Sequence, residues 1–185
     1  MKVIATRDIG VGEEISLSCW LPHTPPFTRT DILTPLPDIP LGLPSAHRTM
    51  ALAQQWGFHC ACDMCLSSRE EKQASDARRE RLVQVQVLLR HEDTAYEALS
   101  GLANELVDLA RAEGMTTKLS DFAFTVATAY FKRGDLATTE KYADVALRYL
   151  MAFGDPDSQL VADLQKNIEW LRGLRAKQAQ NPEGG

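Results

Sequence analysis

Three of the chain's four cysteines fall within six residues, inside the segment WGFHCACDMC at positions 56–65. Cys60, Cys62 and Cys65 form a C-x-C-x-x-C pattern, which places three thiolates within reach of one ion. Zinc in a structural site takes four ligands in a tetrahedron, with each sulfur at roughly 2.3 Å. The sequence therefore predicts a zinc knuckle rather than three unrelated buried cysteines. Its fourth ligand must come from another part of the fold or from a partner.

The spacing and number of the cysteines argue against two other kinds of site. A self-contained zinc ribbon has two C-x-x-C pairs, whereas the intervals here are one residue and then two. A secreted disulfide scaffold has more cysteines, and closely spaced ones bridge only with strain. Residues 1–8 become charged before any apolar stretch forms, so we expect no signal peptide. We expect an intracellular protein, in the nucleus or the cytoplasm.

Composition restricts the partners that the chain can have. The formal net charge of −5 argues against direct nucleic-acid binding, which requires a basic face. No segment is apolar for long enough to cross a bilayer, so no membrane contact is expected. We therefore expect the chain to bind a protein, either as a substrate or as a partner.

Composition and periodicity divide the chain into five segments and predict an α+β fold that is mostly α. Residues 1–20 contain two short runs of period-two alternation, which is typical of strands. Two strands do not form a stable sheet alone, so we expect that Met1 does not begin a domain. Prolines recur through residues 21–44 and predict an extended loop. The remaining segments are a helix with the zinc knuckle at 45–66, a helical domain at 67–178 and a disordered tail at 179–185.

Glycines and apolar periodicity predict where the helices begin and end. Ser45 is expected to cap the first helix and Gly57 to end it. The first expected helix runs from the Ser45 cap through Arg48 to Trp56, and the others cover residues 67–90, 94–112, 117–132, 136–153 and 157–177.

Residues 127–147 resemble a tetratricopeptide helix pair. Gly134 and Asp135 supply the turn, and the small side chains of Ala143 and Ala146 allow the two helices to approach closely. The resemblance implies a stacked helical scaffold, with a peptide-binding groove as the sharper alternative.

The order of several segments is similar to that of a known enzyme family. Along the chain come ATRDI at 5–9, GEEISLS at 12–18, Arg48 and Leu52, WGFHCACDMC at 56–65 and tetratricopeptide-like helices. In this order they resemble the C-terminal end of a SET-domain protein methyltransferase, most closely the SET-and-MYND branch and related fungal SET proteins.

The resemblance implies a fold, a reaction and a set of site residues. It implies a β fragment of a SET domain, a post-SET zinc knuckle and lysine methylation by S-adenosyl-L-methionine. Glu13, Glu14 and Ile15 would begin a SET strand, and Phe58 would lie near the cofactor and the lysine channel. Cys60, Cys62 and Cys65 would be the post-SET zinc ligands.

Two departures from the family pattern bear on catalysis. Cys19 stands where the family has a tyrosine whose hydroxyl orients the target amine, and a thiol is a weaker hydrogen-bond donor. Because of this position, Cys19 is the candidate catalytic residue. It is also the best internal candidate for the fourth zinc ligand. The family's upstream Asn-His-Cys segment, which binds cofactor, is not found in residues 1–8.

We therefore expect a truncated or catalytically impaired methyltransferase. The alternative is a non-catalytic zinc-knuckle and helical-repeat module that binds a protein partner. His47 or His59 could also complete the metal site, whereas Asp63 is expected to be solvated.

Overall fold

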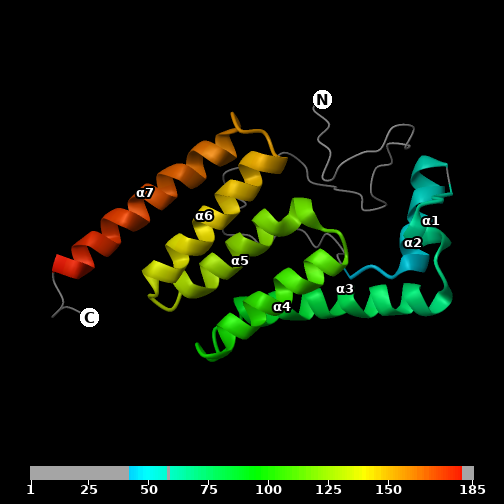
Figure 1. Ribbon diagram of the computed structural model, residues 1–185, viewed down its shortest axis with the longest axis horizontal. Helices are drawn as coiled ribbons and strands as arrows, with labels where there is room; N and C mark the ends of the chain where they lie inside the picture. The colour runs from blue at the N-terminus through cyan, green and yellow to red at the C-terminus, as the bar shows by residue number, and fades with distance from the viewer. Residues whose placement is uncertain (1–41, 58, 181–185) are drawn as a thin grey trace. The chain divides into compact units, whose positions relative to one another are not determined.

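The computed structural model describes residues 42–57 and 59–180, and these residues form helices joined by short turns (Figure 1). The side chains of residues 51, 52, 55 and 56 are not described. The elements in chain order are α1 (Ser45–Trp56), α2 (Asp63–Leu66), α3 (Arg69–Arg90), α4 (Ala98–Ala112), the 3-10 helix η2 (Thr116–Lys118), α5 (Leu119–Phe131), α6 (Leu136–Phe153) and α7 (Gln159–Gln180).

The predicted α+β class is wrong for this part of the chain, because the residues that the structure describes include helices and no strand. The prediction relied on local alternation within residues 1–20, which lie outside the described residues, as do Cys19 and Phe58. A strand needs a neighbouring strand to satisfy its backbone, and the described residues supply none. The predicted helices are present at the expected places, with ends that differ by a few residues.

Two helix beginnings differ from the sequence expectation. Ser45 is the first residue of α1 rather than its cap, and its side chain makes no capping bond within the helix. The beginning of α3 has the capping bonds that α1 lacks. Ser68 Oγ accepts a hydrogen bond from the Glu71 amide at 3.1 Å, and the Ser68 amide donates to Glu71 Oε2 at 2.9 Å. This reciprocal pair is a capping box, which fixes where α3 begins.

The chain divides into two compact units within α3, between Val83 and Gln84. Over the described residues, the first unit contains α1, α2 and the beginning of α3. The second contains the end of α3 and the helices α4 to α7.

The core of the second unit lies between α5, α6 and α7. In Figure 1 these three helices lie side by side, and α6 packs against both neighbours. Ala143 and Ala146 of α6 are buried, as expected for small residues at a close helix contact. The buried cluster comprises Ala123, Ala127, Leu136, Ala143, Ala146, Leu164, Ile168 and Leu171.

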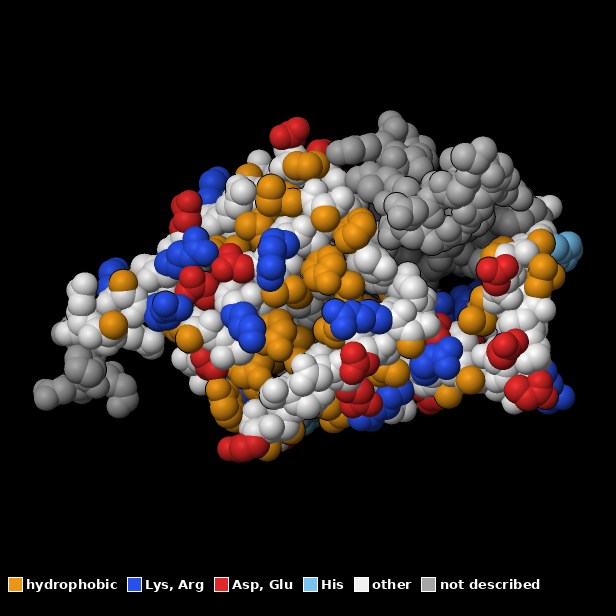
Figure 2. Space-filling model, in the orientation of Figure 1, with side chains coloured by type: hydrophobic (Ala, Val, Ile, Leu, Met, Phe, Trp, Pro, Cys, Tyr) orange, Lys and Arg blue, Asp and Glu red, His pale blue; other side chains and the backbone are white. Residues whose placement is uncertain are grey.

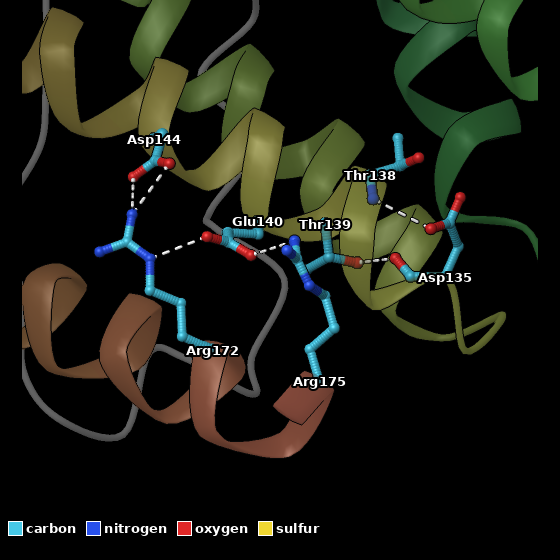
Figure 3. Close-up of polar contacts among 7 residues, drawn as sticks. All are labelled: Asp135, Thr138, Thr139, Glu140, Asp144, Arg172 and Arg175. Carbon is cyan, nitrogen blue, oxygen red and sulfur yellow. Dashed lines mark hydrogen bonds and ion pairs between the residues drawn. The ribbon is translucent and has the colours of Figure 1, made fainter. Parts of the chain in front are cut away.

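The turn between α5 and α6 uses the two residues that the sequence singled out. Gly134 adopts a left-handed conformation with φ 77°, which a residue without a Cβ reaches at little cost. Asp135 then caps α6, because its Oδ1 accepts a hydrogen bond from the Thr138 amide at 2.9 Å. The Thr139 hydroxyl donates to the Asp135 carbonyl oxygen at 2.6 Å (Figure 3). Both the side chain and the backbone of Asp135 therefore hold the first turn of α6.

Charged side chains join α6 to α7 (Figure 3). Glu140 accepts hydrogen bonds from Arg172 Nε at 2.8 Å and from Arg175 Nη1 at 2.6 Å. Arg172 also contacts Asp144 at 3.2 Å, and the hydrogen bond to Glu140 is the main reason why the pKa of Arg172 is raised. The two carboxylates on α6 therefore align α7 along it.

Hydrophobic side chains also lie on the surface of the second unit. Figure 2 shows them gathered over α5 and α6 between lysine and arginine side chains. On α5 and α7, Phe124, Phe131 and Trp170 are about half exposed, and the Phe131 and Trp170 ring centroids lie 6.0 Å apart. Among the described residues, no helix is both long enough and apolar enough to cross a membrane.

Candidate metal centre

The structure brings together the three cysteines that the sequence predicted as metal ligands. The Sγ atoms of Cys60, Cys62 and Cys65 all lie within 4.8 Å of one another. All three residues are thiols and are partly buried. Sulfurs around one zinc at roughly 2.3 Å in a tetrahedron lie about 3.8 Å apart, so a contraction of about an ångström is enough to close the site.

Local backbone structure accounts for this convergence. Gly57 ends α1 in a left-handed conformation with φ 69°, which allows the chain to change direction before the cysteine run. Cys62 has an extended backbone immediately before α2, and Cys65 lies three residues later in its single turn. Cys62 precedes this turn and Cys65 lies within it, so the turn brings the two residues back toward each other, and their sulfurs lie within 4.8 Å.

Hydrogen bonds close α2 at its end. The Leu66 amide donates to the Cys62 carbonyl oxygen at 3.0 Å, and the Ser67 hydroxyl donates to the Met64 carbonyl oxygen at 2.9 Å. The capping box of Ser68 and Glu71 follows at once. These hydrogen bonds fix the direction in which the chain leaves the cysteine cluster.

The helix that leads into the knuckle is held by Asp76 of α3. Its Oδ1 accepts from the Ser45 amide at 2.8 Å, and its Oδ2 accepts from the Ser45 hydroxyl at 2.9 Å. Arg48 is buried on α1 and lies 3.5 Å from Asp76, and its Nη1 donates to the Leu43 carbonyl oxygen at 2.7 Å. A carboxylate at a helix N-terminus satisfies open backbone donors and opposes the helix dipole. Asp76 therefore caps α1 from a different helix.

The other predicted ligands do not join the site. Within the described residues, the group that could hold a metal contains the three cysteines and no histidine or carboxylate. His47, His59 and Asp63 are exposed. Cys19, the remaining internal candidate, lies outside the described residues, and so does Phe58. Three soft thiolates at this spacing fit a thiophilic metal such as zinc.

A second polar cluster, which the sequence did not indicate, lies around Asp135. The Tyr96 hydroxyl donates to Asp135 Oδ2 at 2.6 Å, and the Tyr96 ring meets the Tyr130 ring edge to face with centroids 5.8 Å apart. Tyr142 stacks on Tyr130 at 5.9 Å. The hydrogen bond to Asp135 raises the pKa of Tyr96, and burial followed by the charge effects of Tyr142 and Asp135 raises the pKa of Tyr130.

Opposing effects act on the pKa of Asp135 itself. Burial alone raises the pKa of its carboxyl, but hydrogen bonds from Thr138, Tyr96 and the Ala137 backbone outweigh burial, so the pKa is lowered overall. These contacts stabilise the turn between α5 and α6. Arg133 strengthens the same region, because its guanidinium donates to the carbonyl oxygens of Ala129, His91 and Thr94. We assign this cluster a structural role.

Comparison of the chain with protein-family models, with curated proteins and with solved structures gave no match.

Proposed function

We propose that Cys60, Cys62 and Cys65 bind one zinc ion, and that the chain is part of a SET-type protein-lysine methyltransferase that uses S-adenosyl-L-methionine. The observation that carries the proposal is the convergence of the three sulfurs within 4.8 Å. The order of the sequence segments between residues 5 and 65 supports the family assignment. A reducing compartment, the nucleus or the cytoplasm, is part of the proposal because the thiolates must stay reduced.

Each ligand has a defined task in this proposal. The zinc ion joins Cys60, which precedes α2, to Cys62 and Cys65 at α2, so the short segment after Gly57 takes one conformation. Phe58 belongs to that segment, and the family resemblance gives it a place beside the cofactor. Cys19 is the proposed fourth ligand, which would tie residues 1–20 to the knuckle.

Cys19 also limits the catalysis that we expect. In the family position of Cys19, a tyrosine hydroxyl helps to hold the target amine. Loss of one such positioned donor lowers the rate by about 10²-fold or more. We therefore expect slow methyl transfer from this chain, even with zinc bound.

The methyltransferase proposal is tested by measuring cofactor binding and by sequencing the transcript. Zinc-loaded protein is titrated with S-adenosyl-L-methionine by calorimetry, and transfer of a labelled methyl group to lysate proteins is then measured. Sequencing of the transcript on the 5′ side of the Met1 codon is expected to find an in-frame Asn-His-Cys segment. Absence of that segment together with absence of cofactor binding contradicts the methyltransferase proposal.

A second candidate function is that of a non-catalytic interaction module. It is favoured by the exposed aromatic side chains of Phe124, Phe131 and Trp170 on the helical-repeat unit. Aromatic residues dominate the energetics of many protein interfaces. This candidate predicts a protein partner whose binding is lost in Trp170→Ala and retained in zinc-free protein.

A further inference from the structure

Within the residues that the structure describes, the candidate metal centre offers three sulfur ligands, and a site of three thiolates suits some elements better than others. Zinc takes four ligands, and the group within the described residues supplies three. A soft ion that completes its coordination with three thiolates has no such deficit. Trivalent arsenic meets this requirement, because it forms three bonds and its lone pair occupies the fourth position of the tetrahedron.

We infer that Cys60, Cys62 and Cys65 form a three-thiolate binding site for trivalent arsenic. The three Sγ atoms lie within 4.8 Å of one another, so one small central atom can reach all of them. The partial burial of the cysteines leaves a path for a small neutral solute such as arsenous acid.

The reaction of arsenous acid with the three thiols needs neither an oxidant nor a reductant. Arsenous acid carries three hydroxyl groups, and each is replaced by one cysteine sulfur. Each thiol proton leaves with a hydroxyl group as water, so three As–S bonds form, three As–O bonds break and three waters are released. Arsenic stays trivalent throughout.

Charge favours arsenic at this site as well. Three thiolates around a divalent zinc leave a net charge of −1, whereas three thiolates around trivalent arsenic leave none. A charge that is partly removed from water costs free energy unless it is paired. The neutral complex therefore suits the partly buried cysteines.

The chelate also needs little rearrangement of the chain. The three ligands lie within six consecutive residues. Closing so short a loop orders few residues, so the entropic cost is small. The end of α1 at Gly57 and the capping box of Ser68 and Glu71 bound the segment that has to adjust.

The test uses the full chain, reduced and freed of metal by a chelator. Arsenite is added in slight excess, native mass spectrometry counts the bound arsenic, and a thiol reagent counts the remaining thiols. We expect one arsenic per chain and loss of reactivity at three of the four cysteines. Loss of two thiols or of none, in protein with an unchanged helical circular dichroism spectrum, overturns the inference.

Two serine variants identify the ligands and separate this inference from the zinc proposal. Cys62→Ser is expected to lose arsenic during gel filtration, whereas Cys19→Ser is expected to retain it. Equal loss from both variants overturns the assignment to the three-cysteine cluster. Because the experiment starts from metal-free protein, arsenic can bind whether or not zinc does, so failure of one proposal leaves the other standing.

Discussion

Cys62 lies immediately before α2, and its sulfur belongs to the candidate metal centre. Its replacement therefore removes a ligand without removing a helical residue. The neighbouring Ser67 shares the local hydrogen bonds of α2 but has no sulfur, which makes it a natural control.

We expect Cys62→Ser to lower the zinc content of the purified chain from about one equivalent to a small fraction of that, because two thiolates hold zinc poorly. Metal analysis after gel filtration is the measurement. Ser67→Ala should keep its zinc. A metal-free wild-type protein that is fully folded would contradict the knuckle.

Asp135 is the residue at which a pH effect is expected. Its pKa is lowered in the folded protein, so its contribution to stability is present above the ordinary carboxyl pKa and is lost as the pH falls through the lower, folded value. Asp135→Ala should reduce the free energy of unfolding by about 1 kcal/mol, through loss of the cap on α6.

Asp135→Asn is the matched control, because asparagine caps a helix about as well as aspartate but does not titrate. Its unfolding free energy near neutral pH should lie between the values of the wild type and Asp135→Ala, because one amide oxygen can accept from Thr138 or from Tyr96 but not from both. The acid-dependent part should disappear. Urea unfolding at several pH values below 6 measures both effects. The same acid dependence in Asp135→Asn would show that other groups cause it.

At the scale of elements, the packing of α5 on α6 depends on small side chains. Ala146 is 1 % exposed and belongs to the buried cluster between these helices and α7. Ala146→Leu should destabilise the protein by about 1–3 kcal/mol, because the added carbons have no room. Ala152→Leu on the exposed side of α6 is the control and should change the unfolding free energy little. Similar losses in both variants would mean that the cost comes from the helix itself.

Asp76 of α3 contacts the beginning of α1 through two hydrogen bonds and an ion pair. Asp76→Ala removes the acceptor of both Ser45 hydrogen bonds and the ion partner of Arg48. We expect faster hydrogen exchange of the α1 amides, with a local loss of about 1 kcal/mol. Glu80→Ala, an exposed change on the same helix, should leave this exchange unchanged. Unchanged exchange in Asp76→Ala would show that α1 is held by other contacts.

At the scale of the whole molecule, the helical region is expected to fold on its own. The predicted boundary lies after residue 66, and the buried cluster of α5, α6 and α7 contains no residue before it. A polypeptide of residues 67–180 should melt cooperatively when followed by circular dichroism at a helical wavelength. An unfolded 67–180 beside a stable full chain would show that the two parts share one core.

Local sequence signals determined most of the helical elements and the clustering of the three cysteines. Gly57, Gly134 and the short-range spacing of the cysteines act within a few residues, so their effect can be derived without a fold. The zinc interpretation stays a prediction, but the proximity of the three sulfurs that it required is confirmed. The SET resemblance and the tasks of Cys19 and Phe58 also stay predictions.

The tertiary structure decided the contacts between residues that are far apart in the sequence. Asp76 caps a helix that begins 31 residues earlier, and Tyr96 reaches Asp135 across 39 residues. Nothing in the neighbourhood of either residue marks it for this task, because the partner is brought near only when the helices pack. The α+β expectation is wrong for the described residues, which contain helices and no strand, whereas the alternation that suggested it falls in residues 1–20, outside them. Alternation is a local pattern, whereas a strand exists only where the fold supplies its neighbour.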